Sequence, residues 1–237
     1  MLNGKTALVT GASGQGMGRS IALTLARDGY AVAVNYLKNQ TAADEITALI
    51  RNRGGRAIAV QGDVFKQEDC ERLVQVAAAE LGGLDVCVIS PGAGWNLEPI
   101  FALKPKQSLR DVFQEVAPIY YLLPHVLVEM RKKKQGRIIG IASNLTIPSP
   151  SYSYNAAKAA RTEALKQAVS TAWKAGVTVN IIAPGPVDAF RSLEEADAAL
   201  QAGAHGKVTP QDIAEGVAFL CSDAGRYITG CVLPYMF

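Results

Sequence analysis

The stretch SYSYNAAKAA at residues 151–160 places two tyrosines near one lysine, a combination that could move a proton. Tyr154 and Lys158 are four positions apart and would share one face of a helix, whereas Tyr152 is six positions from the lysine and would point elsewhere. A phenol holds its proton at neutral pH because its reference pKa is about 10. An adjacent ammonium stabilises the phenolate and lowers this pKa, so the phenol becomes a usable acid or base. We predict a catalytic Tyr154–Lys158 pair, although a buried contact without chemistry would have the same spacing.

A hydroxyl group close to this pair could hold the oxygen atom that exchanges the proton. Ser143 ends the apolar run RIIGIAS at residues 137–143, the last such run before the helical stretch that carries Tyr154. A serine hydroxyl can both donate and accept a hydrogen bond. We therefore predict Ser143 as the third member of the catalytic group.

The segment TGASGQGMGRSIA at residues 10–22 could bind a phosphate group. Its glycines permit positive φ angles and let the backbone approach a pyrophosphate, and the helix that follows would present its free N–H groups and positive dipole end. A glycine-rich loop alone is a weak signal. Between the first strand and first helix of an alternating chain it favours dinucleotide binding over a tight structural turn. The residues that we assign to this loop are Gly11, Ser13, Gly16, Met17 and Gly18.

The end of the second apolar run, NYLKN at residues 35–39, indicates which dinucleotide would bind. An acidic residue there would accept hydrogen bonds from the ribose of NAD and repel a 2′-phosphate. The chain instead offers Asn35, Tyr36 and Lys38, so we expect NADP(H) rather than NAD(H). After the third run, Asp63 could bind the adenine amino group, with Val64 beside it.

Short apolar runs alternate with helical stretches along the whole chain. The runs lack a polar alternate face, as expected for strands covered on both sides. They lie at residues 5–10, 31–36, 57–60, 84–90, 137–143, 177–183 and 229–234. One helix should begin at the capping signature TAAD (residues 41–44), and another should run from Tyr154 to about Ala175. We predict an α/β fold with a single Rossmann domain over residues 1–237, doubly wound, with about seven parallel strands and helices on both faces.

The composition describes an ordinary globular protein. The net charge of the 237 residues is +3, which gives no argument for binding nucleic acid or a membrane surface. The four cysteines and two histidines show no metal-ligand spacing, so we expect no metal and a reducing compartment. The first residues do not read as a signal peptide, and no apolar run approaches membrane-spanning length. We expect a cytoplasmic location.

Taken together, the motifs resemble the short-chain dehydrogenase/reductase family over essentially the full chain, most closely its 3-oxoacyl-[acyl-carrier-protein] reductase-like branch. The matching segments are TGAS and GMG in the first loop, Asp63–Val64, Ser143, Tyr154 with Lys158, Pro184–Gly185, and YITG at residues 227–230. The resemblance implies that Tyr154 protonates a carbonyl oxygen while nicotinamide delivers a hydride to the carbonyl carbon. Ser143 would orient that oxygen, and Lys158 would hold the nicotinamide ribose and lower the pKa of Tyr154.

The resemblance also implies further contacts and an assembly. Cofactor contacts are expected at Pro91, Gly92, Pro184, Gly185 and the backbone of Val187. Members of the family mostly form tetramers, so we expect a homo-oligomer, either tetramer or dimer. Lys134 stands near the position where acyl-carrier reductases place a basic docking residue. A carrier-linked acyl thioester is therefore one option for the substrate, beside a small carbonyl compound or alcohol.

Among the departures from the family pattern, three concern residues around the predicted site. Gly14–Gln15 adds a residue to the glycine loop, so the turn should bulge. ISPG at residues 89–92 replaces NNAG and loses the amides that brace the central sheet. Val116 aligns with the asparagine that helps to hold a relay water, and we hypothesise that carbonyls exposed by Pro118 hold that water instead.

Two rival interpretations use the same motifs. Enoyl reductases of the family also have a loop that ends in SIA, but they space tyrosine and lysine seven apart, and Ser151 stands where their tyrosine would be. The other rival is a sensor or scaffold that binds the cofactor without turnover.

Overall fold

The computed structural model describes residues 4–94, 98–146, 150–202 and 207–235. Seven strands form one parallel sheet in the order β3-β2-β1-β4-β5-β6-β7. The strands are β1 (Thr6–Val9), β2 (Ala31–Tyr36), β3 (Ala57–Gln61), β4 (Val86–Ile89), β5 (Gly136–Ile141), β6 (Val177–Pro184) and β7 (Val232–Tyr235). The α-helices are α1 (Met17–Arg27), α2 (Gln40–Asn52), α3 (Gln67–Leu81), α4 (Pro105–Lys133), α5 (Tyr152–Lys174), α6 (Leu193–Ala202) and α7 (Pro210–Cys221), with a short 3₁₀ turn η1 (Ile100–Ala102).

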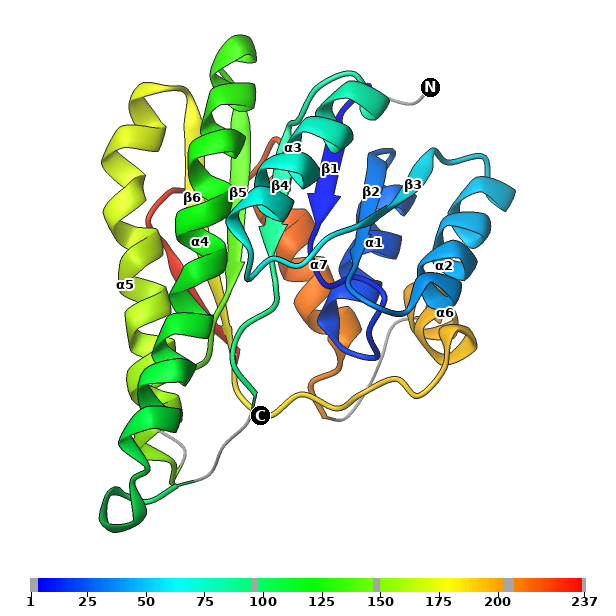
Figure 1. Ribbon diagram of the computed structural model, residues 1–237. Helices are drawn as coiled ribbons and strands as arrows, with labels where there is room; N and C mark the ends of the chain where they lie inside the picture. The colour runs from blue at the N-terminus through cyan, green and yellow to red at the C-terminus, as the bar shows by residue number, and fades with distance from the viewer. Residues whose placement is uncertain (1–3, 95–97, 147–149, 203–206, 236–237) are drawn as a thin grey trace.

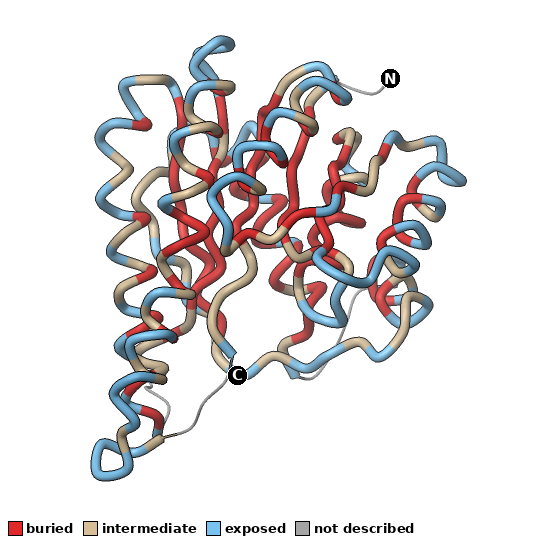
Figure 2. The backbone as a smooth tube through the Cα atoms, viewed as in Figure 1, coloured by how far each residue is buried: buried red, intermediate tan, exposed pale blue. Residues whose placement is uncertain are grey.

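Helices cover both faces of the sheet, so the predicted α/β class is confirmed (Figure 1). Side chains of α1, α2, α6 and α7 pack with one set of strand residues into a first core, for example Ile21 against Val32. Side chains of α3, α4 and α5 pack with the alternate strand residues, for example Leu122 with Leu8, into a second core. This double burial explains why the strand sequences carry no polar face, and the buried backbone follows the strands through the middle of the molecule (Figure 2).

The strand order reverses between β1 and β4, and this reversal places the site. Strands β2 and β3 extend the sheet on one side of β1, whereas β4 to β7 extend it on the other. The crossovers leave a crevice outside the carboxyl ends of the strands at this switch point, where open α/β sheets bind ligands. The glycine loop between β1 and α1 and the segment after β4 both begin there.

Two predicted helix starts were displaced. Helix α2 is capped by Asn39, whose side chain accepts a hydrogen bond from the Ala42 N–H at 3.1 Å, rather than by Thr41. Helix α5 begins at Tyr152, two residues before the predicted start, because Ser151 caps it and its hydroxyl accepts from the Tyr154 N–H at 3.3 Å. Within the described residues, no helix has the length and apolar character needed to cross a membrane.

Candidate active site

The three predicted catalytic residues come together at the carboxyl edge of the sheet. Tyr154 lies in the first turn of α5, and its phenol is hydrogen-bonded to the side chain of Ser143, which follows β5. The Lys158 Nζ atom lies 5.4 Å from the centroid of the Tyr154 ring. Tyr152 is 54% exposed, so the choice of tyrosine by helical spacing agrees with the structure. The Ser143 hydroxyl also donates to the Pro184 carbonyl at 3.4 Å, which ties β5 to β6.

A carboxylate that the sequence analysis did not find contacts the lysine. Glu115 on α4 forms an ion pair with Lys158 through Oε1 at 2.8 Å and with Arg161 through Oε2 at 3.3 Å. Glu115 and Arg161 are both 0% exposed, and Lys158 is 8% exposed. Such a burial of three charges requires close pairing and hydrogen bonds. Glu115, which meets Lys158, is the neighbour of Val116, the position that we aligned with the relay asparagine.

The same arginine replaces the brace that the ISPG sequence lacks. Arg161 donates to the carbonyl of Ile89 through Nη2 at 2.7 Å and to that of Pro91 through Nη1 at 2.9 Å. A guanidinium from α5 thus ties down the segment after β4, where relatives are expected to use side-chain amides. A Cβ on Gly92 would lie 2.6 Å from Glu115 Cδ, so this segment and the buried carboxylate fit only with glycine at residue 92.

The electrostatics of the site differ from the sequence expectation. Burial raises the pKa of the Tyr154 phenol, and the Glu115 carboxylate adds to this rise, while the hydrogen bond with Ser143 opposes it. We had expected Lys158 to lower this pKa. Burial lowers the pKa of Lys158 itself, and Glu115 opposes that change. The sequence expectation for the pKa of Tyr154 left out burial, which is the largest cause of the rise, and the carboxylate that already pairs with the ammonium.

The glycine loop has the features of a phosphate cradle. Gly11 has φ +63°, and a Cβ on it would lie 2.6 Å from Cγ of Pro91. Gly16 is the N-cap residue of α1, with Met17 and Gly18 in the first turn, and among the described residues no side chain caps this turn. Its N–H groups are thus available to an anion. Gly14, Gln15 and Gly16 are exposed, as expected for a bulge, and Ser13 is half-buried.

Asn35 has a different part from the one predicted. It is 2% exposed, and its Oδ1 atom accepts from the Gly11 N–H at 3.0 Å while Nδ2 donates to the Gly62 carbonyl at 3.0 Å. The side chain therefore braces the glycine loop and does not present its amide at the strand tip. Tyr36 is buried too, so of the three predicted tip residues only Lys38 is exposed.

The remaining predicted contacts lie along the same edge. The Asp63 carboxylate accepts from the Phe65 N–H at 3.0 Å within the turn after β3, and Val64 is buried beside it. Pro184 ends β6, and the Gly185 N–H donates to the Tyr235 carbonyl at 3.0 Å. Val187 is partly buried against the first core.

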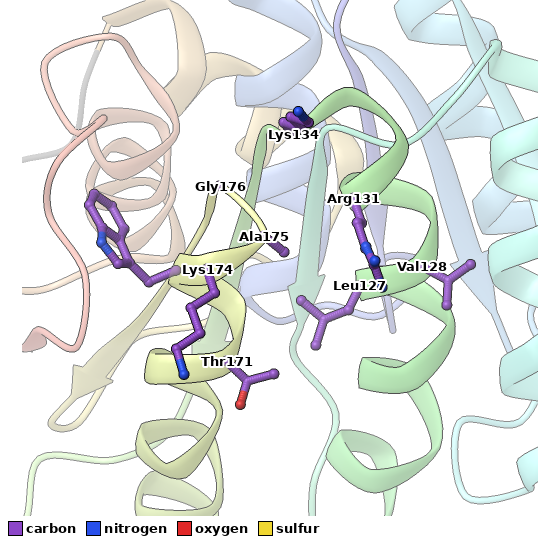
Figure 3. Close-up of a pocket in the computed structure, with 9 residues that line it drawn as sticks. Leu127, Val128, Arg131, Lys134, Thr171, Lys174, Ala175 and Gly176 are labelled. Atoms are coloured by element: carbon purple, nitrogen blue, oxygen red, sulfur yellow. The ribbon is translucent and has the colours of Figure 1, made fainter.

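A surface hollow lies toward the C-terminal ends of α4 and α5, away from Tyr154. A surface pocket of about 790 Å³ is lined by residues of α4 and α5 that include Arg131, Lys134 and Lys174 (Figure 3). Lys174 is twenty residues beyond Tyr154. At the helical rise this is about 30 Å. The pocket is therefore separate from the Ser143–Tyr154–Lys158 group, and its size is no guide to where chemistry occurs.

A parallel sheet with a phosphate cradle at its switch point and a Ser–Tyr–Lys group beside it defines a nucleotide-binding oxidoreductase of the Rossmann class. A family model described as Enoyl-(Acyl carrier protein) reductase matches residues 11–235. The chain is 34% identical over 236 residues to a 3-oxoacyl-[acyl-carrier-protein] reductase of Staphylococcus epidermidis, covering 95% of both chains. The chain belongs to the short-chain dehydrogenase/reductase family.

Solved structures agree with this assignment. A 7α-hydroxysteroid dehydrogenase in complex with NADH and 7-oxo glycochenodeoxycholic acid has a TM-score of 0.85 at 28% identity, over 99% of this chain and 93% of that one. A dehydrogenase/reductase from Sinorhizobium meliloti 1021 has a TM-score of 0.82 at 32% identity, over 98% of this chain and 93% of that one. NADH and 7-oxo glycochenodeoxycholic acid are ligands of that dehydrogenase.

Proposed function

We propose that the protein is an NADP(H)-dependent oxidoreductase that interconverts a carbonyl group and a secondary alcohol. The observation that carries this proposal is the Tyr154 phenol, hydrogen-bonded to Ser143 and stacked near the Lys158 ammonium. A phenol and a second hydroxyl that share one site can bind a carbonyl oxygen from two sides. Ser143 would orient this oxygen, and Tyr154 would pass its proton to it.

The residues present fit a nicotinamide dinucleotide. The uncapped first turn of α1 and the cradle at Gly11 suit a pyrophosphate, and Asn35 fixes the shape of that cradle. The exposed Lys38 would attract a 2′-phosphate, which is the reason we propose NADP(H). When bound, the cofactor would supply or accept the hydride at the carbonyl carbon. Lys158 lies one helical turn after Tyr154, where it could hold a ribose hydroxyl.

The substrate class that we propose is an acyl thioester linked to a carrier protein. The basic pocket with Arg131, Lys134 and Lys174 is separate from the Ser143–Tyr154–Lys158 group, so this part of the proposal rests on the relatives and not on the pocket (Figure 3). Curated relatives named 3-oxoacyl-[acyl-carrier-protein] reductase agree with this substrate class. All four cysteines lie within the described residues and are free thiols, which supports a cytoplasmic site of action.

The test follows nicotinamide absorbance with a panel of 3-oxoacyl thioesters, other ketones and secondary alcohols, each with NADPH and NADH. We expect turnover with NADPH, and a loss of about 10²–10⁴-fold in Tyr154→Phe, because the proton donor is removed. Tyr152→Phe is the matched control on the same helix and should retain wild-type turnover. Stoichiometric NADPH binding without turnover of any compound would instead identify a cofactor-binding sensor or scaffold.

A further inference from the structure

The buried ion cluster fixes its carboxylate from several sides. Glu115 Oε1 pairs with Lys158 at 2.8 Å and accepts from the Ala93 N–H at 2.9 Å, while Oε2 pairs with Arg161 at 3.3 Å. Arg161 also donates to the Glu115 backbone carbonyl at 3.1 Å. A carboxylate with partners at both oxygens and no exposure has one orientation, and that orientation faces the lysine of the catalytic group.

We propose that Glu115 is the positioning residue of this site, where it holds the Lys158 ammonium, cancels its charge and so keeps the Tyr154 phenol protonated for carbonyl reduction. This inference rests on the proposed function. Lys158 and Arg161 carry two positive charges and Glu115 carries one negative charge, so the cluster contributes one net positive charge beside the phenol. Without the carboxylate, the cluster would carry two positive charges, one of them on the Lys158 ammonium near the Tyr154 ring, and would favour phenolate.

The proton balance links this charge to the direction of the reaction. In reduction, the O–H bond of Tyr154 breaks and its proton forms the new O–H bond of the alcohol, while the hydride forms the new C–H bond. Tyr154 is left as a phenolate and must regain a proton from solvent. Oxidation needs the phenolate at the start, as the base that takes the alcohol proton. A phenol kept protonated at neutral pH therefore favours reduction, and oxidation should speed up as the pH rises.

Among the described residues, the charged side chains of the ion cluster come from two helices. From α5 they are Lys158 and Arg161, and from α4 the group is Glu115. Asp111, one turn before Glu115, accepts from the Gln107 side chain at 2.7 Å. The segment after β4 contributes the backbone carbonyls that Arg161 binds. Glu115 is the carboxylate of this cluster, and its removal would raise the net charge of the three side chains from +1 to +2.

The decisive experiment titrates Tyr154 in the protein without cofactor. Phenolate absorbance is measured against pH, and the same curve from a Tyr154→Phe background is subtracted. In Glu115→Gln we expect the pKa of Tyr154 to fall by roughly one unit, because an anion has been removed. Oxidation of a secondary alcohol at neutral pH should then rise about tenfold, in line with the larger phenolate fraction. General damage to the site would not increase a rate.

A second variant should move the titration the other way. Arg161→Gln removes a cation, so the pKa of Tyr154 should rise. Glu129→Gln is the matched control for Glu115→Gln, because both glutamates lie on α4. Glu129 pairs with Lys132 away from the site, so this variant should leave the titration of Tyr154 unchanged.

The outcomes separate this inference from the proposed function. The titration requires no turnover. A protein that turns over no compound but still shows the two opposite pKa shifts of Tyr154 would contradict the proposed function and support the role of Glu115. An unchanged pKa in a folded Glu115→Gln variant would overturn the inference. If Glu115→Gln does not fold, Arg161→Gln is the test: a rise in the pKa of Tyr154 would support the inference, and a fall or no change would overturn it. Failure of both to fold would make the cluster a folding element and overturn it as well.

Discussion

At the scale of single residues, Gly92 joins the backbone after β4 to the buried carboxylate. A Cβ there would overlap the Glu115 side chain, which cannot move without losing its partners Lys158 and Arg161. We predict that Gly92→Ala costs about 1–3 kcal/mol of folding free energy, the usual cost of overpacking a core. Turnover should fall too, because the displaced carboxylate no longer holds the lysine.

Thermal unfolding and steady-state turnover of the same preparations test this prediction. Gly94→Ala is the matched control, since a Cβ at Gly94 meets no atom within 4 Å. If Gly92→Ala has wild-type stability and turnover, the backbone after β4 can shift to accommodate the added Cβ, and the prediction of a rigidly held Glu115 is wrong.

Some of these residues could be predicted from sequence and others could not. Tyr154 and Lys158 lie within one helical turn, so their spacing alone predicts that they meet. Glu115 comes from a different helix, 43 positions before Lys158 (158 − 115), and no local pattern reports such a contact. Asn35 was misassigned because a strand-tip amide can turn inward to the backbone as readily as outward to a ribose. The sequence does hold one clue to Glu115. Arg161 is a second cation on the lysine face of an alanine-rich helix, and a buried cation requires an anionic partner.

At the scale of elements, Asp85 ties the start of the central sheet to the end of α4. Its carboxylate accepts from the Thr6 N–H at 2.9 Å and the Thr6 hydroxyl at 2.9 Å, and it pairs with Lys133 at 3.0 Å. Asp85 is 5% exposed and precedes β4, at the end of the sheet opposite the Ser143–Tyr154–Lys158 group. We predict that Asp85→Asn lowers the free energy of unfolding by about 2 kcal/mol, because the uncharged amide loses the ion pair with Lys133 and weakens the hydrogen bonds with Thr6.

For a chain of this size such a loss lowers the Tm by roughly 4–8 °C. The turnover number at 25 °C should stay at the wild-type value, since Thr6 and Lys133, the partners of the Asp85 carboxylate, lie outside the Ser143–Tyr154–Lys158 group. Asp223→Asn is the matched control, because its ion pair with Lys5 is exposed and should contribute little. Equal Tm values for the two variants would contradict this account of the link between sheet and helix.

The elements themselves were largely predictable, but their order in the sheet was not. Apolar runs of four to seven residues predicted each strand, since strands buried on both sides must be continuously apolar. Strand order depends on which face of the sheet each crossover helix covers. The apolar stripe of a helix shows that the helix packs on the sheet, but it does not show on which face. The start of α2 was missed because Asn39 caps it two residues ahead of the Thr41 signature.

At the scale of the whole molecule, α4 and α5 lie side by side (Figure 1), and part of the exposed surface of α4 is apolar. Phe113, Tyr120 and Val128 on α4 are 50%, 66% and 61% exposed. They follow one another at seven and eight positions, about two turns each, so they share a face. Exposed apolar stripes of this kind mark protein–protein contacts. We predict that this face joins copies of the chain into a dimer or tetramer.

Light scattering gives the mass of the assembly directly. The wild-type protein should have two or four times the chain mass of 25.1 kDa. The double variant Tyr120→Glu/Val128→Glu should fall to a smaller assembly, because two carboxylates would have to be desolvated in each copy of the interface. Leu37→Glu adds a charge at an exposed apolar residue in the turn after β2 and should leave the mass unchanged. A wild-type monomer, or a double variant of unaltered mass, would place any contact between copies elsewhere on the surface.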